Sequence, residues 1–176
     1  MARRKRNSSR VNATGRNDQT DRFAGLRHRF LITEAYRSLD SVARALLVEV
    51  VMLESGKNNG SLWLSIADAT DRLGMSDQHV AIRAFADLQD RGFIVMTKDA
   101  HFSVKAGETS RARCWRLTWV SFDGKPPTND WEKYVAPPNT KARKRADRGL
   151  RAMARYRKAQ AAHRMPVVDF TAMGSK

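Results

Sequence analysis

Three side chains suited to hydrogen bonding with nucleic-acid bases lie close together in the chain: Gln78, His79 and Arg83. Arg pairs with the O6 and N7 atoms of guanine, and Gln pairs with the N6 and N7 atoms of adenine. Apolar residues recur through the same stretch at spacings of three and four, which predicts a helix that buries Val80, Ala81, Ala84, Phe85 and Leu88. The outward positions of that helix are then Asp77, Gln78, His79, Ile82, Arg83 and Ala86. We therefore expect Gln78, His79, Ile82 and Arg83 to read bases, although an ordinary helical hairpin in a small α/β domain is the simpler alternative.

Elements on both sides of this helix would hold it in place. Ser65 followed by Asp68 is a capping-box pattern, which predicts a preceding helix that begins at Ile66. Gly74 supplies a residue that tolerates a left-handed turn, and Ser76 is suited to cap the second helix. After Gly92, residues 93–96 have the composition of a strand. Helix, tight turn, helix, glycine and strand is the pattern of a helix-turn-helix that continues into a β-hairpin.

Three segments have the composition of short strands, namely residues 61–64, 93–97 and 113–120. They predict a small three-stranded antiparallel sheet, with the buried face of the last strand formed by Trp115, Leu117 and Trp119. The polar segment 98–110 would be the tip of a hairpin, or wing. We expect DNA backbone contacts from Ser76, Lys98, His101, Lys105, Arg111 and Arg113. A purely solvated loop is the alternative interpretation of the wing.

Residues 31–134 resemble a largely uncharacterised group of small bacterial winged helix-turn-helix proteins. The resemblance depends on Ala35-Tyr36-Arg37-Ser38-Leu39, the loop Gly56-Lys57-Asn58-Asn59-Gly60, the run 66–94, His101-Phe102-Ser103, the strand 114–119 and Thr128-Asn129-Asp130-Trp131. It implies an α+β winged helix-turn-helix fold and DNA binding, but neither a target nor a pathway. The stretch from Ser76 to Arg83 is one residue longer than such domains lead us to expect. Which of Gln78, His79 and Ile82 faces the groove therefore stays open.

Positive charge is concentrated at the two ends of the chain, which carries a net charge of +15. Residues 1–30 hold nine Lys and Arg against two Asp, and residues 141–164 hold ten against one Asp. The middle, residues 31–140, is nearly neutral, with thirteen Lys and Arg against fourteen Asp and Glu. Such arms usually serve an anionic polymer, because neutralised phosphates release counterions. A solvated tail is the alternative.

The distribution of charge divides the chain into a basic disordered arm at 1–29, a winged helix-turn-helix domain at 30–136 and a basic, helical C-terminal extension at 137–176. We expect phosphate contacts from Arg3, Arg4, Lys5, Arg6, Lys141, Arg143, Lys144, Arg145, Arg148, Arg151 and Arg155. The extension has a thin apolar stripe of Ala146, Leu150, Met153 and Tyr156. A helix with so little surface to bury is expected to fold on binding nucleic acid.

No pattern for catalysis or for a cofactor stands out in the sequence. A single cysteine, Cys114, excludes an internal disulfide, and the four histidines lack the spacing of metal ligands. There is no Gly-rich phosphate loop, no nucleophile turn and no apolar run long enough to span a membrane. We therefore expect a cytoplasmic protein of the nucleoid with no enzymatic activity, no metal and no cofactor.

The composition and motifs favour sequence-specific binding of double-stranded DNA by a bacterial transcriptional regulator. A plasmid or phage replication factor and a nucleoid-associated factor would use the same domain. A basic protein associated with RNA or the ribosome belongs to a different class, because its arms would follow folded RNA. An adaptor in which the winged helix is only a scaffold is a further alternative. The sequence leaves the oligomeric state open, and a homodimer is among the choices.

Overall fold

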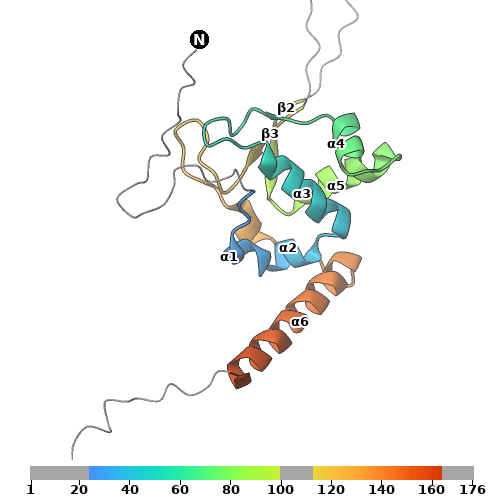
Figure 1. The fold of residues 1–176 in the computed structure, drawn as a ribbon, viewed down its shortest axis with the longest axis vertical. Coiled ribbons are helices and arrows are strands. Elements are labelled where there is room, and N and C mark those ends of the chain that lie inside the picture. Colours follow the sequence, from blue (N-terminus) through green and yellow to red (C-terminus); the bar gives the residue numbers. More distant parts are fainter. Residues whose placement is uncertain (1–23, 100–112, 164–176) are drawn as a thin grey trace, which may run out of the picture.

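The computed structural model describes residues 24–99 and 113–163 and has an α+β architecture (Figure 1). Within these residues the structure has six α-helices and a small antiparallel sheet of three strands. The helices are α1 (His28–Leu31), α2 (Glu34–Ser38), α3 (Ser41–Met52), α4 (Ile66–Arg72), α5 (Gln78–Asp90) and α6 (Lys141–His163). The strands are β1 (Leu62–Trp63), β2 (Ile94–Lys98) and β3 (Cys114–Leu117), and a 3-10 helix, η1, spans Asp130–Lys133.

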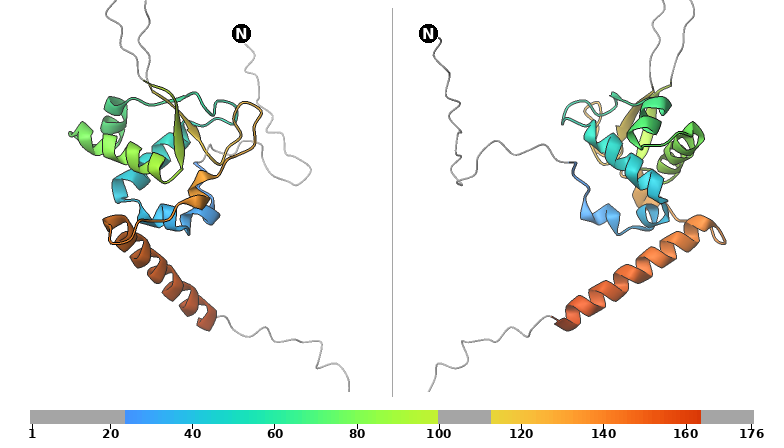
Figure 2. Two further views of the ribbon diagram at one scale, coloured as in Figure 1. Left: turned by 180° about the vertical axis from the view of Figure 1, so that it is seen from behind. Right: turned by 45° about the vertical axis from the view of Figure 1, so that its right-hand side comes forward.

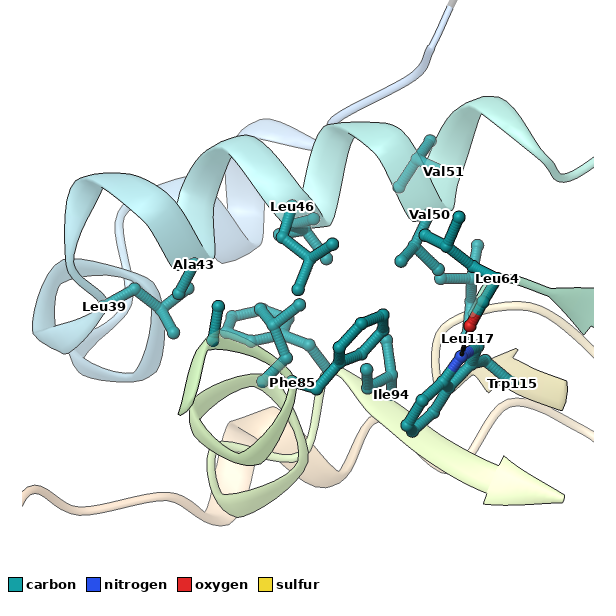
Figure 3. Close-up of a cluster of buried hydrophobic side chains, with 14 of the residues drawn as sticks. Leu39, Ala43, Leu46, Val50, Val51, Leu64, Phe85, Ile94, Trp115 and Leu117 are labelled. Carbon is teal, nitrogen blue, oxygen red and sulfur yellow. Dashed lines mark hydrogen bonds between the residues drawn. The ribbon is translucent and has the colours of Figure 1, made fainter. Parts of the chain in front are cut away.

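Helix α3 is the central helix of the core, as its apolar sequence predicts. Asp40 is the N-cap of α3, since the Asp40 carboxylate accepts a hydrogen bond from the Ala43 backbone N–H at 2.8 Å. Its buried side chains are Ala43, Leu46, Leu47, Val50 and Val51. Of these, Ala43, Leu46 and Val50 face α5 and the sheet in Figure 3. The apolar side chains of α3 thus form the surface against which α5 packs.

The predicted N-cap of α4 is confirmed, although the Asp68 carboxylate bonds the Ser65 hydroxyl and not the Ser65 backbone N–H of a full capping box. Ser65 Oγ accepts a hydrogen bond from the Asp68 backbone N–H at 3.0 Å and donates one to the Asp68 carboxylate at 2.7 Å. The predicted cap of α5 is wrong by one residue, because Asp77 and not Ser76 caps the helix. The Asp77 carboxylate accepts a hydrogen bond from the His79 N–H at 2.8 Å, so Ser76 lies in the turn before the helix.

The sheet has the strand order β1-β3-β2, and both pairings are antiparallel. Leu62 and Met96 both lie opposite Trp115, which fixes the register of the two outer strands against β3. The third strand is shorter than the predicted segment 113–120, because it ends at Leu117. Beyond it, the Thr118 carbonyl accepts hydrogen bonds from the backbone N–H groups of Thr128 and Asn129, which turns the chain out of the sheet.

One face of β3 is buried against the helices, as the alternation of its residues predicts. Trp115, Leu117 and Trp119 are all buried. The Trp115 ring stacks on Phe85 of α5 with 4.5 Å between ring centroids, and its indole N–H donates to the Leu64 carbonyl at 3.2 Å (Figure 3). This pair connects the sheet directly to α5.

Gly92 follows α5 in the chain and packs against the backbone of η1. Gly92 has a φ of +71°, a backbone conformation that a residue with a side chain adopts at a cost. A Cβ atom there would also lie 2.6 Å from the Asp130 carbonyl carbon. The predicted short helix around Trp131 is this 3-10 helix, and Trp131 packs against Phe93 in the core. The segment after the sheet therefore folds back on the domain.

Candidate nucleic-acid interface

Helix α5 has one buried face and one exposed face, as predicted. Its buried residues are Ala81, Ala84, Phe85 and Leu88, whereas Val80 is half-buried. The four side chains expected to read bases are all exposed, namely Gln78, His79, Ile82 and Arg83. Ile82 is 43% exposed although it is a large apolar residue. The four therefore form one outward-facing row along the first half of α5.

The charges along this row are sparse. Arg83 is exposed, and its Nε atom donates to the His79 backbone carbonyl at 3.4 Å, so the guanidinium lies along the helix surface. The Asp77 carboxylate already occupies the N-terminal end of α5. Because a carboxylate repels phosphate, this end of the helix is poorly suited to binding a DNA backbone. The exposed face of α5 is thus better suited to base edges than to phosphates.

Two of the wing residues predicted to contact DNA, Lys98 and Arg113, lie in the described part of the chain. Lys98 is exposed at the end of β2. Arg113 is half-buried, and its Nε atom lies 3.1 Å from the Asp99 carboxylate, so a phosphate would compete with an existing ion pair. The predicted wing contacts His101, Lys105 and Arg111 lie outside the described residues.

Trp63 is an exposed aromatic residue at the base of the hairpin that sequence reasoning did not single out. It is 66% exposed, and it lies opposite Cys114, as Lys98 does on the other side of β3. The β2–β3 register shifts between Met96 and Lys98, so this shared partner shows that Trp63 and Lys98 lie at the same end of the sheet. The alternation of Leu62, Trp63 and Leu64 indicates the exposure of Trp63, because the two leucines are buried.

A buried arginine, Arg91, anchors the far end of α5. Its side chain donates to Ser38 Oγ of α2 at 2.8 Å and to the Asp87 carboxylate at 2.9 Å. The guanidinium also lies over the Tyr134 ring. The four-residue spacing of Asp87 and Arg91 indicates an ion pair on one helix face, but the sequence does not indicate the contact with α2. These bonds fix the position of α5 relative to α2.

Helix α6 carries the residues of the predicted C-terminal basic arm. Among them Arg143 is half-buried and pairs with Glu34 of α2 at 2.8 Å. The other predicted contacts on α6 are exposed, namely Lys141, Lys144, Arg145, Arg148, Arg151 and Arg155. The predicted contacts of the N-terminal arm, Arg3, Arg4, Lys5 and Arg6, lie outside the described residues.

A second arginine group lies between α2, α3 and α6. Burial lowers the pKa of Arg44, and the nearby positive charges of Arg37 and Arg145 act in the same direction. Arg44 donates to the Arg37 carbonyl at 3.0 Å and lies over the Tyr36 ring. Its contacts are thus made within the domain, and its role is to support α2.

In the described part of the chain, no cluster of three or more His, Cys, Asp or Glu residues is arranged to hold a metal ion. None of the helices described is both long enough and apolar enough to cross a lipid bilayer. In comparisons with known proteins, no family model, no curated protein and no solved structure matches the chain.

Proposed function

We propose that the protein binds double-stranded DNA in a sequence-specific manner through a winged helix-turn-helix domain, as a bacterial transcriptional regulator in the cytoplasm. In this assignment α4 and α5 form the helix-turn-helix, α5 is the recognition helix, and the hairpin of β2 and β3 is the wing. The observation that carries the proposal is the row of Gln78, His79, Ile82 and Arg83, which is exposed on a helix held firmly by the core.

The chemistry of the row fits the edges of base pairs in a major groove. The groove is wide enough to admit an α-helix, and the N-terminal half of a recognition helix supplies the base contacts. Arg83 is suited to guanine and Gln78 to adenine, while Ile82 offers an apolar surface to the methyl group of thymine. Rigid mounting supports this role, because base reading requires side chains that are held in place. The stack of Phe85 on Trp115 and the bonds of Arg91 supply that mounting.

The arms would supply most of the affinity in this proposal. Residues 31–140 have fourteen acidic against thirteen basic residues, so the domain has almost no net field to attract a polyanion. Phosphate contacts from the basic segments at both ends would hold the duplex while α5 tests its sequence. The same concentration of charge also favours a second candidate, a replication or nucleoid-associated factor that binds DNA with little sequence preference. RNA is the alternative partner for such arms.

Selection of duplexes from a random pool, followed by titration of variants, tests the proposal. We expect Arg83→Ala to weaken binding to the selected duplex by roughly 1–3 kcal/mol and to relax preference at one base pair. Arg72→Ala is a matched control, because Arg72 lies on α4 and pairs with Glu49 at 3.4 Å. Enrichment of no motif, or retention of every preference in Arg83→Ala, Gln78→Ala and His79→Ala combined, would refute base reading by α5. Tighter binding of structured RNA than of any duplex would favour the RNA alternative.

A further inference from the structure

Helix α6 is held against the domain by one face only. Ala146 is fully buried there, and Arg37 Nη2 of α2 contacts the Met153 sulfur at 2.8 Å. Arg143 pairs with Glu34, whose carboxylate also accepts a hydrogen bond from the Ala136 N–H at 2.6 Å. Figure 2 shows that α6 starts beside α2 and extends away from the other helices. The docked face therefore fixes which face of α6 points outward.

Six basic residues form a regular stripe on the opposite face of α6. They follow one another at spacings of three and four residues and are all exposed, namely Lys141, Lys144, Arg148, Arg151, Arg155 and Lys158. At 100° per residue, spacings that alternate between three and four keep side chains on one side of a helix. At 1.5 Å per residue the stripe is about 26 Å long. That length corresponds to about seven or eight base-pair steps of duplex DNA.

The stripe has no acidic partner on its own helix. Asp147 is the single acidic residue of α6, and it pairs with Arg143, which lies off the stripe. Neighbouring like charges at these spacings repel one another, and basic residues in the first turn oppose the helix dipole. Both effects destabilise α6 when its charges are unpaired, and a polyanion along the stripe would relieve both.

We propose that this stripe is a second, preformed DNA-binding face, which follows the phosphate backbone of a duplex and is separate from the exposed face of α5. It rests on the proposed function, because it takes duplex DNA as the partner. The stripe is narrow, and small residues flank its second half, Ala152 on one side and Ala154 on the other, whereas Arg145 and Asp147 lie beside its first half. One row of cations with small neighbours fits a single line of phosphates, whereas a helix seated within a groove would meet phosphates on two sides. Arg143 is a positioning residue that holds the stripe outward.

Two variants of the full chain with equal loss of charge test the proposal. The stripe variant is Arg148→Gln with Arg155→Gln, and the control is Arg72→Gln with Arg157→Gln, whose residues are exposed and lie off the stripe. Gln and Arg have similar helix propensities, so circular dichroism should be the same for both. Affinity for a duplex of scrambled sequence is measured at several salt concentrations. We expect the salt slope of the stripe variant to fall by about 1.8, since each phosphate contact contributes about 0.9. The control slope should change by less than half of that.

The outcomes separate this proposal from the assignment of α5. Equal changes of the salt slope in the two variants would overturn the stripe, because the affinity would then depend on the total charge of the chain and not on the position of the charges. Competition by polyglutamate as effective as competition by duplex DNA would overturn DNA as its partner. If the stripe variant shifts the salt slope while selection enriches no sequence motif, the stripe stands and base reading by α5 fails. If motif selection succeeds while the slope stays unchanged, the stripe fails and base reading stands.

Discussion

Asn59 connects the loop after α3 to the end of β3, and its replacement should be the costliest polar substitution in that loop. Its side-chain N–H groups donate to the carbonyls of Leu117, Val120 and Ser121 at 3.0–3.2 Å. Its side-chain oxygen accepts from the Leu117 backbone N–H at 2.7 Å. In Asn59→Ala the Leu117 N–H loses its partner at the edge of the core. We expect a loss of about 3 kcal/mol in unfolding free energy, because an orphaned buried group costs roughly 1–3 kcal/mol and each further bond about 1 kcal/mol.

The adjacent Asn58 provides a matched control. Asn58 accepts from the Ser55 N–H and donates to the Leu53 carbonyl, both at 2.8 Å, so its bonds stay within the loop and the end of α3. Water can replace those partners, and Asn58→Ala should therefore cost about 1 kcal/mol. Urea unfolding followed by tryptophan fluorescence measures both values, provided that the m-value is unchanged. If Asn58→Ala costs as much as Asn59→Ala, the cross-connection to β3 does not supply the stability argued for it.

Two further substitutions test the mounting of α5. Gly92→Ala should lower the unfolding free energy by about 2–4 kcal/mol in thermal unfolding. The left-handed conformation costs roughly 1–2 kcal/mol, and the new Cβ would also press on the backbone of η1. A loss smaller than the cost of the left-handed conformation alone would contradict the contact with η1. Arg91→Met should cost about 2–3 kcal/mol in urea unfolding, near the low end for a broken buried ion pair because Asp87 is partly exposed. Unchanged stability would mean that the bond to Ser38 contributes nothing.

The elements around the site are predicted well wherever short-range chemistry decides them. Ser65 and Asp68 are three residues apart, and their two hydrogen bonds depend on nothing beyond that turn. The alternation of Trp115 and Leu117 likewise indicates which face of β3 is buried. The misplaced cap of α5 has a local cause too. Ser76 and Asp77 are adjacent residues that can both cap, and the carboxylate makes the bond.

What could not be predicted depends on contacts between distant parts of the chain. Arg91 reaches Ser38 across 53 residues, and Arg143 reaches Glu34 across 109 residues. No periodicity relates such pairs, because their meeting follows from a tertiary arrangement that packs α2 against α6 and brings Ser38 to the C-terminal end of α5. For the same reason the sequence identifies Arg143 as one phosphate contact among many. The structure adds an ion pair with Glu34, which places Arg143 beside α2.

The different mounting of α5 and α6 matches the different precision that their proposed roles demand. Helix α5 is fixed along one side by Ala81, Ala84, Phe85 and Leu88, and at its end by Arg91, so the direction of its exposed face is fixed. A hydrogen bond to a base edge depends on distance and angle, and a displacement of about 1 Å would weaken it. Helix α6 is held by one face over part of its length. Attraction between a guanidinium and a phosphate falls off slowly with distance, so a row of cations tolerates a looser mount. If α5 reads bases and α6 contacts phosphates as proposed, the firmly packed helix carries the contacts that depend steeply on geometry, and the lightly packed helix carries those that do not.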